Sequence, residues 1–178
     1  MKDISFEIVQ DGGIEQCREL CNELMAFQKS KAFLEPERFD AMDFDTRMRR
    51  SYDCALAKQV VVVKDSGVPV GYAFSTIDSL DDLRRSPFKL LPERSDLPSR
   101  IGCLSNLYLR EGYRGTGLGS KLFDMSMDWF DRFDDLSQIF IFISNGNDDA
   151  YDFYIKRGFV YSHAVLGGFI KAVRKERK

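Results

Sequence analysis

A glycine-rich turn lies between an apolar run and an amphipathic run in the stretch from Leu104 to Phe130. Gly115, Gly117 and Gly119 alternate with other residues in this turn. Glycine permits a sharp change of chain direction and leaves no Cβ in the way of a ligand. The first N–H groups of the helix that follows have no partner within the helix, and the peptide dipoles add partial positive charge there. This arrangement suits the binding of a pyrophosphate.

The order of residues in the turn excludes two common nucleotide-binding motifs. A P-loop ends in Gly-Lys-Ser/Thr, whereas this turn ends in Gly119, Ser120 and Lys121. The dinucleotide fingerprint is G-x-G-x-x-G, with an acidic residue at the end of the next strand. Here the spacing is G-x-G-x-G, and residues 144–147 after the next apolar run read Ser-Asn-Gly-Asn. An ordinary glycine-rich turn between a strand and a helix is the alternative to a ligand-binding one.

Two motifs resemble those of the GNAT N-acetyltransferase superfamily. The first is Arg-x-x-Gly-x-Gly at residues 114–119, after an apolar strand. The second is Asn-x-x-Ala-x-x-x-Tyr-x-x-x-Gly-Phe at residues 147–159, after the continuous apolar run 139–143. Two signatures in the right order are more specific than either one. The resemblance is specific over residues 104–159 and general over the N-terminal half.

The resemblance implies an α/β (α+β) fold of the GNAT type, with residues 1–178 as a single domain. Its central sheet would be mixed and mostly antiparallel, with about seven strands and helices on both faces. Apolar periodicity predicts strands at 4–9, 59–64, 68–77, 101–109, 139–143, 159–164 and 168–174, and helices at 14–27, about 44–55, after the glycine turn and after residue 147. A polar break is expected at 28–31. Residues 79–100 contain three prolines and are interpreted as an insertion at the active-site mouth, partly helical around 80–85.

The resemblance also implies acetyl-CoA as co-substrate and indicates the residues that bind it. The backbone of Leu107, Tyr108 and Leu109 would contact the acetyl and pantetheine groups. The pyrophosphate would be held by Arg114, Gly115, Thr116, Gly117, Leu118, Gly119 and Ser120. Asn147 matches a residue that contacts the cofactor arm, and a helix-capping role would explain it equally well.

Acetyl transfer to an amine needs a neutral amine, a stabilised oxyanion and a protonated leaving thiolate. The resemblance implies that Tyr154 protonates the thiolate, since a tyrosine O–H with a pKa near 10 can donate to it. The alternative for Tyr154 is a core aromatic beside Phe153 and Phe159. Many relatives carry a glutamate base on the central strand, where this chain has Ser105 and Asn106. The base is therefore left open among Asp78, Asp81, Asp82, Glu35, Glu37 and a water chain held by Ser105 and Asn106.

The acceptor is expected to be a small primary amine. In the family, the segment between the first two helices lines the acceptor cleft, so the candidates for acceptor contact are Phe33, Leu34, Glu35, Glu37 and Phe39. Acidic residues around the cleft suit a cationic acceptor, namely Glu35, Glu37, Asp40, Asp43, Asp78, Asp81 and Asp82. The alternatives are an acetyltransferase for protein lysines or N-termini, and a catalytically silent module that binds or senses acyl-CoA.

Composition indicates which kinds of binding partner and which cellular compartment to expect. A net charge of -2 and a pI near 5.5 argue against nucleic-acid binding. No apolar run approaches the length of a membrane span, and the N-terminus has no signal-peptide core, so we expect a cytoplasmic protein. The cysteines are interpreted as small buried hydrophobic residues, and no metal site is expected because the chain has one histidine, His163. The cysteines are Cys17, Cys21, Cys54 and Cys103. A homodimer through the C-terminal strands is common in the family.

Overall fold

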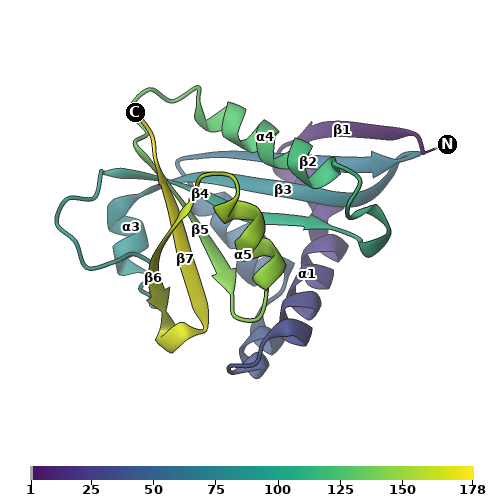
Figure 1. The fold of residues 1–178 in the computed structure, drawn as a ribbon. Helices are drawn as coiled ribbons and strands as arrows, with labels where there is room; N and C mark the ends of the chain where they lie inside the picture. The colour runs from purple at the N-terminus through teal and green to yellow at the C-terminus, as the bar shows by residue number, and fades with distance from the viewer. Residues whose placement is uncertain (1) are drawn as a thin grey trace.

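A computed structural model describes residues 2–178 and shows one seven-stranded sheet with helices on both faces (Figure 1). The strands are β1 (Ile4–Val9), β2 (Ala57–Asp65), β3 (Val68–Ser79), β4 (Arg100–Leu109), β5 (Gln138–Ser144), β6 (Val160–Val165) and β7 (Ile170–Glu176). Their order in the sheet is β1-β2-β3-β4-β5-β7-β6. The pair β4–β5 is parallel and the other neighbours are antiparallel. The mixed, mostly antiparallel sheet that the sequence predicts is confirmed.

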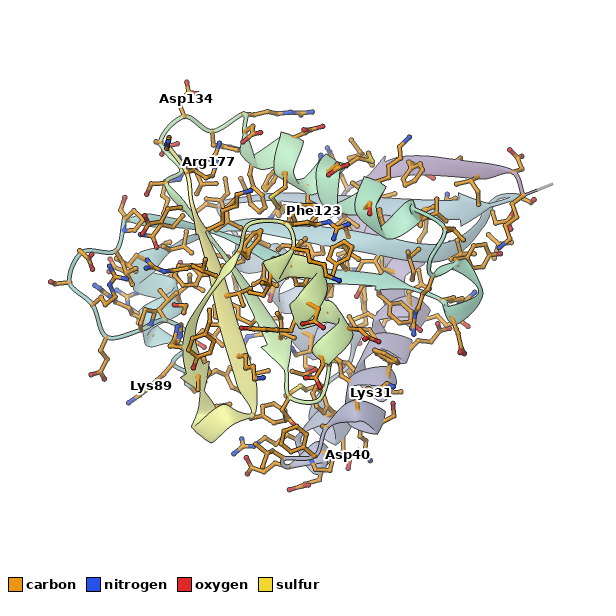
Figure 2. The ribbon with its side chains drawn as sticks, in the orientation of Figure 1. Lys31, Asp40, Lys89, Phe123, Asp134 and Arg177 are labelled. Atoms are coloured by element: carbon orange, nitrogen blue, oxygen red, sulfur yellow. The ribbon has the colours of Figure 1, made fainter. Side chains whose placement is uncertain are left out.

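Helices cover the sheet in two layers that meet it through separate apolar clusters. The helices are α1 (Arg18–Lys31), α2 (Arg50–Cys54), α3 (Leu80–Arg85), α4 (Leu118–Phe130) and α5 (Asp148–Ile155). The cluster under α4 and α5 is separate from the cluster under α1 and α2. In the α4–α5 layer, the ring of Phe123 lies 5.8–6.2 Å from the rings of Phe153, Tyr154 and Phe159 (Figure 2). These aromatic contacts join α4 to α5.

The junction of β4 and β5 is short. Only Gly102 pairs with Ile139 and Cys103 with Phe140, so the two strands diverge beyond Cys103. The edge of β4 that faces β5 therefore has no strand partner from Leu104 onward. A Cβ on Gly102 would meet side chains at 3.1–3.2 Å, which shows how closely the paired part is packed. The divergence opens a gap in the middle of the sheet.

A β-bulge lies in β4 beside this gap. Phe74 of β3 pairs with Asn106, whereas Ser75 pairs with Leu104, so Ser105 is the extra residue. A bulge bends its strand and increases the local twist, and bulges are common beside active sites. The bulge lies in the strand that leads into the glycine turn.

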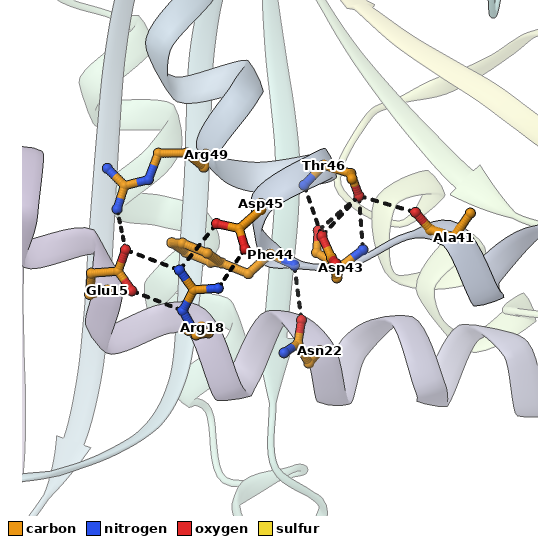
Figure 3. Close-up of polar contacts among 9 residues, drawn as sticks. All are labelled: Glu15, Arg18, Asn22, Ala41, Asp43, Phe44, Asp45, Thr46 and Arg49. Carbon is orange, nitrogen blue, oxygen red and sulfur yellow. Dashed lines mark hydrogen bonds and ion pairs between the residues drawn. The ribbon is translucent and has the colours of Figure 1, made fainter.

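Polar contacts join α1 to the segment that precedes α2, the π-helical turn Phe44–Arg49 (Figure 3). Arg18 Nη1 donates to Asp45 Oδ2 at 2.7 Å, and the N–H of buried Phe44 donates to Asn22 Oδ1 at 2.9 Å. Asp43 forms a capping box with Thr46 at the start of the turn. The exposed ion pairs contribute little to stability. The Asn22 bond matters more because it satisfies a backbone group at the buried contact between the two segments.

The boundaries of α1 differ from the prediction. A 3-10 turn, Asp11–Cys17, precedes α1, and the helix continues to Lys31. The polar break expected at 28–31 is therefore wrong. Lys29, Ser30 and Lys31 are not buried, so their polarity marks the outer side of the last helical turn and does not end the helix. Lys31 and Asp40 lie at the same end of the molecule (Figure 2).

The insertion before β4 is anchored to the sheet. Its first turn is α3, as the sequence predicts, and Leu91 and Leu97 pack with Ile101, Phe140 and other residues of a third apolar cluster. His163 Nε2 lies 2.6 Å from the carbonyl oxygen of Leu90, which joins the insertion to β6. The 79–100 segment therefore covers part of one face of β4 and β5.

The cysteine interpretation is correct for three residues and wrong for one. Cys17, Cys21 and Cys103 are buried, and Cys54 is exposed. Cys54 is the last residue of the short helix α2, where the chain turns towards β2. A helix end leaves one side of the residue open to solvent, so its apolar neighbours in sequence did not indicate burial.

Candidate active site

A small cavity of about 40 Å³ lies in the gap where β4 and β5 diverge. Its walls come from β4, β5, α1 and α5. The lining residues are Leu24, Gln28, Leu104, Ser105, Asn106, Leu107, Ile141, Phe142, Ile143, Asn147, Ala150 and Tyr154. Five residues singled out by the sequence are therefore brought together at one place, namely Ser105, Asn106, Leu107, Asn147 and Tyr154.

Tyr154 is a core aromatic residue that also borders the cavity. Its ring is 94% covered and packs against Phe123, Phe153 and Phe159, as a core aromatic does. The residue also lines the cavity, and its hydroxyl takes part in none of the side-chain hydrogen bonds described within residues 2–178. Burial raises the pKa of Tyr154, so the hydroxyl keeps its proton at neutral pH. The side chain is held rigidly with a free O–H at the cavity.

Asn147 precedes α5 and does not cap it through its side chain. It occupies the N-cap position, but no cap hydrogen bond from its amide is formed. Asp148 and Asp149 supply negative charge in the first turn instead. The capping role does not account for Asn147, whose side chain lies at the cavity.

The glycine turn leads into α4 through two residues with positive φ. Gly115 has φ of 70° and Gly117, the N-cap of α4, has φ of 85°. A Cβ built on either glycine would meet no atom within 4 Å, so the turn borders open space. The N–H groups of Leu118, Gly119 and Ser120 lie in the first turn of the helix, where no intrahelical acceptor exists. Thr116 stabilises the turn through a bond of 2.6 Å from Oγ1 to the carbonyl oxygen of Tyr113.

Arg114 is directed back towards the protein. Its Nε donates to the carbonyl oxygen of Leu109 at 2.9 Å, and its guanidinium lies 4.4 Å from the centre of the Phe27 ring on α1. The side chain thus ties the glycine turn to β4 and α1. A cation reaches the first turn of α4 from the turn that follows α5, where Arg157 Nη2 donates to Ser120 Oγ at 2.7 Å.

Arg157 is the site residue that the sequence analysis missed. It stands at a variable position of the second motif, next to the equally basic Lys156, and nothing in the sequence distinguishes the two. The fold separates them, because Lys156 is exposed while Arg157 packs 3.4 Å from the centre of the Phe153 ring.

The side chains of Tyr108 and Leu109 do not reach the cavity. The Tyr108 ring is buried in the cluster under α1, with its hydroxyl 3.4 Å from Glu23 Oε2. Leu109 is buried in the cluster under α4. Only their backbone is available at the open edge of β4, as the resemblance implied.

The loop after α1 is held beside the cavity by one buried amide. Asn145 Oδ1 accepts from the N–H groups of Phe33 and Leu34 at 2.8 and 2.9 Å. Its Nδ2 donates to the carbonyl oxygens of Leu34 and Phe169 at 3.1 and 3.0 Å. Phe33 is left 73% exposed. Phe39, which the sequence suggested for acceptor contact, is buried against Phe169 at 5.1 Å between ring centres and is unavailable.

Several acidic residues of the expected cleft are paired within the protein. Glu35 pairs with Arg38 at 3.0 Å, and Asp40 pairs with Lys29 at 2.5 Å. Asp82 lies 3.9 Å from Arg85, and Asp43 is used in its capping box. Among the described ion pairs, Glu37, Asp78 and Asp81 have no cationic partner.

Asp78 is connected to the bulge through a hydroxyl group. Thr76 Oγ1 donates to Asp78 Oδ2 at 2.6 Å and lies 3.4 Å from Ser105 Oγ. Burial raises the pKa of the Asp78 carboxyl, and hydrogen bonds from Thr76 and Cys103 oppose that rise. Of the acids that the sequence left open as bases, Asp78 is the one joined to a residue of the cavity.

Membrane-spanning helices and metal-binding clusters are both absent from the part of the chain that the structure describes. Across residues 2–178, no helix is long and apolar enough to cross a bilayer. The same residues contain no group of three or more His, Cys, Asp or Glu side chains placed to hold a metal ion.

Comparisons with known proteins agree on a family and a fold. A family model described as Acetyltransferase (GNAT) family matches residues 19–159. Among curated protein sequences no match is found. The chain is similar to the solved structure of the PaiA N-acetyltransferase from Thermoplasma acidophilum in complex with coenzyme A, with a TM-score of 0.64, 14% identity, and coverage of 97% of this chain and 99% of the other.

Two further solved structures resemble the chain equally well. One is the NatC complex bound to Gag peptide and CoA, with a TM-score of 0.63, 13% identity, and coverage of 98% and 99% of the two chains. The other is Naa50 from Arabidopsis thaliana in complex with the bisubstrate analogue CoA-Ac-MVNAL, with a TM-score of 0.61, 17% identity and 97% coverage of both chains. At these identities the likeness shows the fold, and it confirms the one expected from the two motifs.

Proposed function

The chain belongs to the acetyltransferase (GNAT) family, and we propose that it moves the acetyl group of acetyl-CoA directly onto a primary amine of a small cationic acceptor. The observation that carries this proposal is the cavity between the β4 bulge and Tyr154. This cavity has the two groups that acyl transfer needs. One is a strand edge with free backbone N–H groups that can stabilise the oxyanion, and the other is a rigid hydroxyl that can donate a proton to the leaving thiolate. Residues 1–178 act as a single domain in this proposal.

The donor is bound along β4 and at the start of α4. The unpaired edge at Leu107, Tyr108 and Leu109 offers backbone groups to the pantetheine and acetyl parts. The turn at residues 114–120 offers N–H groups to the pyrophosphate, and the open space around Gly115 and Gly117 supports this role. Arg157 adds positive charge beside Ser120. Asn147 contacts the arm from the opposite wall of the cavity.

Tyr154 protonates the leaving thiolate. A free thiol of this kind has a pKa of about 8.5, well below that of a buried tyrosine, so the tyrosine is protonated when the thiolate forms. Its free hydroxyl can then donate a hydrogen bond and afterwards the proton. Burial of the ring keeps the hydroxyl in one position.

A positively charged acceptor is supported by acids that lack an ion-pair partner, one of which is linked to the cavity. Glu37, Asp78 and Asp81 have no cationic partner among the described ion pairs, and Asp78 is connected to the cavity through Thr76 and Ser105. The support is smaller than the sequence suggested, because Glu35 and Asp40 are already neutralised by Arg38 and Lys29.

A peptide N-terminus is the second candidate acceptor. Two similar structures carry peptide ligands, the Gag peptide in NatC and the analogue CoA-Ac-MVNAL in Naa50. In this chain the loop held by Asn145 presents Phe33 and Leu34, which are 73% and 38% exposed. Such a loop could contact the apolar first residue of a peptide.

One assay separates the candidates. Purified protein is incubated with acetyl-CoA and a panel of spermidine, lysine, kanamycin and a peptide beginning with Met, and released thiol is measured. Calorimetry with CoA is run in parallel. Acetylation of spermidine or kanamycin supports a small cationic acceptor, and acetylation of the peptide alone supports the second candidate. If CoA binds and no amine is acetylated, the protein is a silent acyl-CoA-binding module. If CoA does not bind, the whole proposal fails.

The cellular setting is also part of the proposal. We expect a cytoplasmic protein, which cell fractionation tests. We expect a homodimer through the C-terminal strands, where Val160 and Tyr161 of the edge strand β6 are exposed. Light scattering of the purified protein measures its mass, and a monomer would remove this part of the proposal.

A further inference from the structure

A chain of two hydroxyl groups leads from the bulge of β4 to the carboxyl group of Asp78. We propose that Asp78 is the final acceptor of the proton that the acceptor amine must lose, and that Ser105 and Thr76 relay this proton. The inference rests on the proposed function and deepens it by assigning the base. Asp78 acts through the two hydroxyls and does not touch the substrate.

The geometry of the relay starts at the cavity. Ser105 is exposed and lines the cavity together with Asn106 and Tyr154. Ser105 follows Cys103, the cross-strand partner of Thr76, by two residues, so its side chain lies on the same face of the sheet as Thr76 of β3, with 3.4 Å between the hydroxyl oxygens. The second step, from Thr76 Oγ1 to Asp78 Oδ2, is a strong bond of 2.6 Å. The distance of the first step, from Ser105 Oγ to Thr76 Oγ1, is long for an O–H···O hydrogen bond. Such long distances are common in catalytic sites without substrate.

The surroundings suit Asp78 to hold a proton for part of the cycle. Burial makes the charged carboxylate less favourable, and Asp82 on α3 adds negative charge nearby. From β4, the Cys103 thiol contacts the carboxyl and stays protonated because its own pKa is raised by burial. From β2, Lys58 lies opposite Thr76, but its ammonium donates to the carbonyl oxygen of Tyr52 at 2.6 Å. Among residues 2–178, no described ion pair holds Asp78 permanently in the charged form.

The proton steps balance. The acceptor ammonium gives a proton to Ser105 Oγ, Ser105 gives its hydroxyl proton to Thr76, and Thr76 gives its proton to Asp78 Oδ2. Both hydroxyls are restored, and the amine has a free electron pair. The amine nitrogen bonds to the acetyl carbon and the carbon–sulfur bond breaks. Tyr154 protonates the thiolate and regains a proton from the new amide nitrogen. Asp78 returns its proton to water.

The other acids fit this role less well. Glu35 is paired with Arg38, and Asp82 lies near Arg85. Glu37 and Asp81 are free of cations, but no described hydrogen bond connects either to a cavity residue. The relay therefore supplies at the bulge what a strand glutamate would supply directly.

The decisive experiment is the pH dependence of kcat/KM for Asp78→Asn, with spermidine as the acceptor probe or, if only the peptide is acetylated, the peptide. In wild type, kcat/KM should be level around neutral pH and fall on the acid side as Asp78 is protonated. In Asp78→Asn it should fall about 100-fold or more at pH 7 and rise with pH towards the pKa of the amine, about 10, because only neutral amine reacts. Asp124→Asn removes the same charge from an exposed position on α4 that has no proposed role, and it should keep the wild-type profile.

Two further variants test the relay itself. Thr76→Val keeps the shape of Thr76 and removes its hydroxyl, so its kcat/KM should show the same pH dependence as that of Asp78→Asn. Thr76→Ser keeps a hydroxyl, so its kcat/KM should again be level around neutral pH. A hydrazide analogue of the acceptor, whose nitrogen is already neutral at pH 7, should be acetylated by Asp78→Asn at nearly the wild-type rate. If Asp78→Asn acetylates both the amine and the hydrazide much more slowly than wild type does, Asp78 has a structural role and the inference is overturned.

The outcomes separate this inference from the proposed function. CoA affinity and the thermal unfolding of each variant show whether it is folded. If the wild type acetylates an amine and Asp78→Asn keeps its level pH profile, the relay is wrong and the enzyme assignment stands. If the wild type binds CoA and acetylates nothing, the assignment and the relay fail together.

Discussion

Arg157 Nη2 donates to Ser120 Oγ across 2.7 Å and thereby joins the end of α5 to the first turn of α4. The two residues lie 37 positions apart in the chain, with Arg157 inside the second motif and Ser120 directly after the first. The guanidinium also packs on the Phe153 ring at 3.4 Å. A cation is thus fixed beside the N–H groups proposed to hold the pyrophosphate.

Replacing Arg157 should weaken CoA binding. Arg157→Ala removes a charge next to the phosphates, and the loss of one hydrogen bond to a charged group should raise Kd by about 10-fold or more. Arg157→Lys should lose less affinity for CoA than Arg157→Ala does, because the positive charge remains. Lys156→Ala, a neighbouring exposed cation, is the control and should keep the wild-type Kd. Calorimetry with CoA measures all three, and equal affinities for the Arg157 and Lys156 variants would contradict the proposed phosphate contact.

Removing the Tyr154 hydroxyl should slow the chemical step. Tyr154→Phe keeps the packed ring, so stability and CoA affinity should change little. The rate constant kcat should fall about 100-fold, since the leaving thiolate loses its proton donor. Tyr151→Phe removes a tyrosine hydroxyl from the same helix and serves as the control. A Tyr154→Phe enzyme at full rate would restrict the residue to the hydrophobic core.

Alanine should be tolerated at Gly112, which precedes the glycine turn, and should not be tolerated at Gly117 within the turn. Gly117 has φ of 85°, and alanine there should cost about 1–2 kcal/mol of stability and distort the N–H groups at the start of α4. Gly112 lies outside the positive-φ region and has open space around it, so Gly112→Ala should be neutral or slightly stabilising. Urea unfolding and CoA titration of the pair give the comparison. Equal losses in both variants would show that the left-handed backbone is not the cause.

Two asparagines, Asn145 and Asn147, should respond differently to alanine. Asn145 is buried and makes four hydrogen bonds that hold the loop after α1, so Asn145→Ala should cost about 2–4 kcal/mol. Asn147 makes no cap bond, so Asn147→Ala should leave the free energy of unfolding nearly unchanged and weaken CoA binding. A large stability loss in Asn147→Ala would mean that its amide has a structural partner.

Asp78 should make the protein less stable as pH rises. Its pKa is raised in the folded state, so between the unfolded and folded pKa values the folded state binds more protons, and stability falls through that window. Above the folded pKa the cost is fully present. Asp78→Asn should therefore raise Tm at pH 7, and its advantage should shrink as pH falls below both pKa values. Thermal melts of wild type and variant across this pH range check the sign.

The sequence predicted the elements that follow from local patterns. Four consecutive valines at 60–63 indicated a buried strand, and the prolines of the 79–100 segment limited regular structure to its first turn, as α3 shows. The predicted end of α1 was wrong because a run of polar residues on the exposed face of a helix has the same sequence pattern as a loop. The site was harder to predict. The contact of Ser105 with Thr76 depends on the register in which β3 and β4 are paired, and hydrophobic periodicity does not report register.

The pairing of β4 with β5 over two residues has a mechanical consequence. It divides the sheet into one half made of β1 to β4 and another made of β5, β7 and β6, each with continuous antiparallel ladders. Small rotations between the halves would strain few backbone hydrogen bonds. The width of the opening between them can therefore adapt to its contents while both halves stay intact.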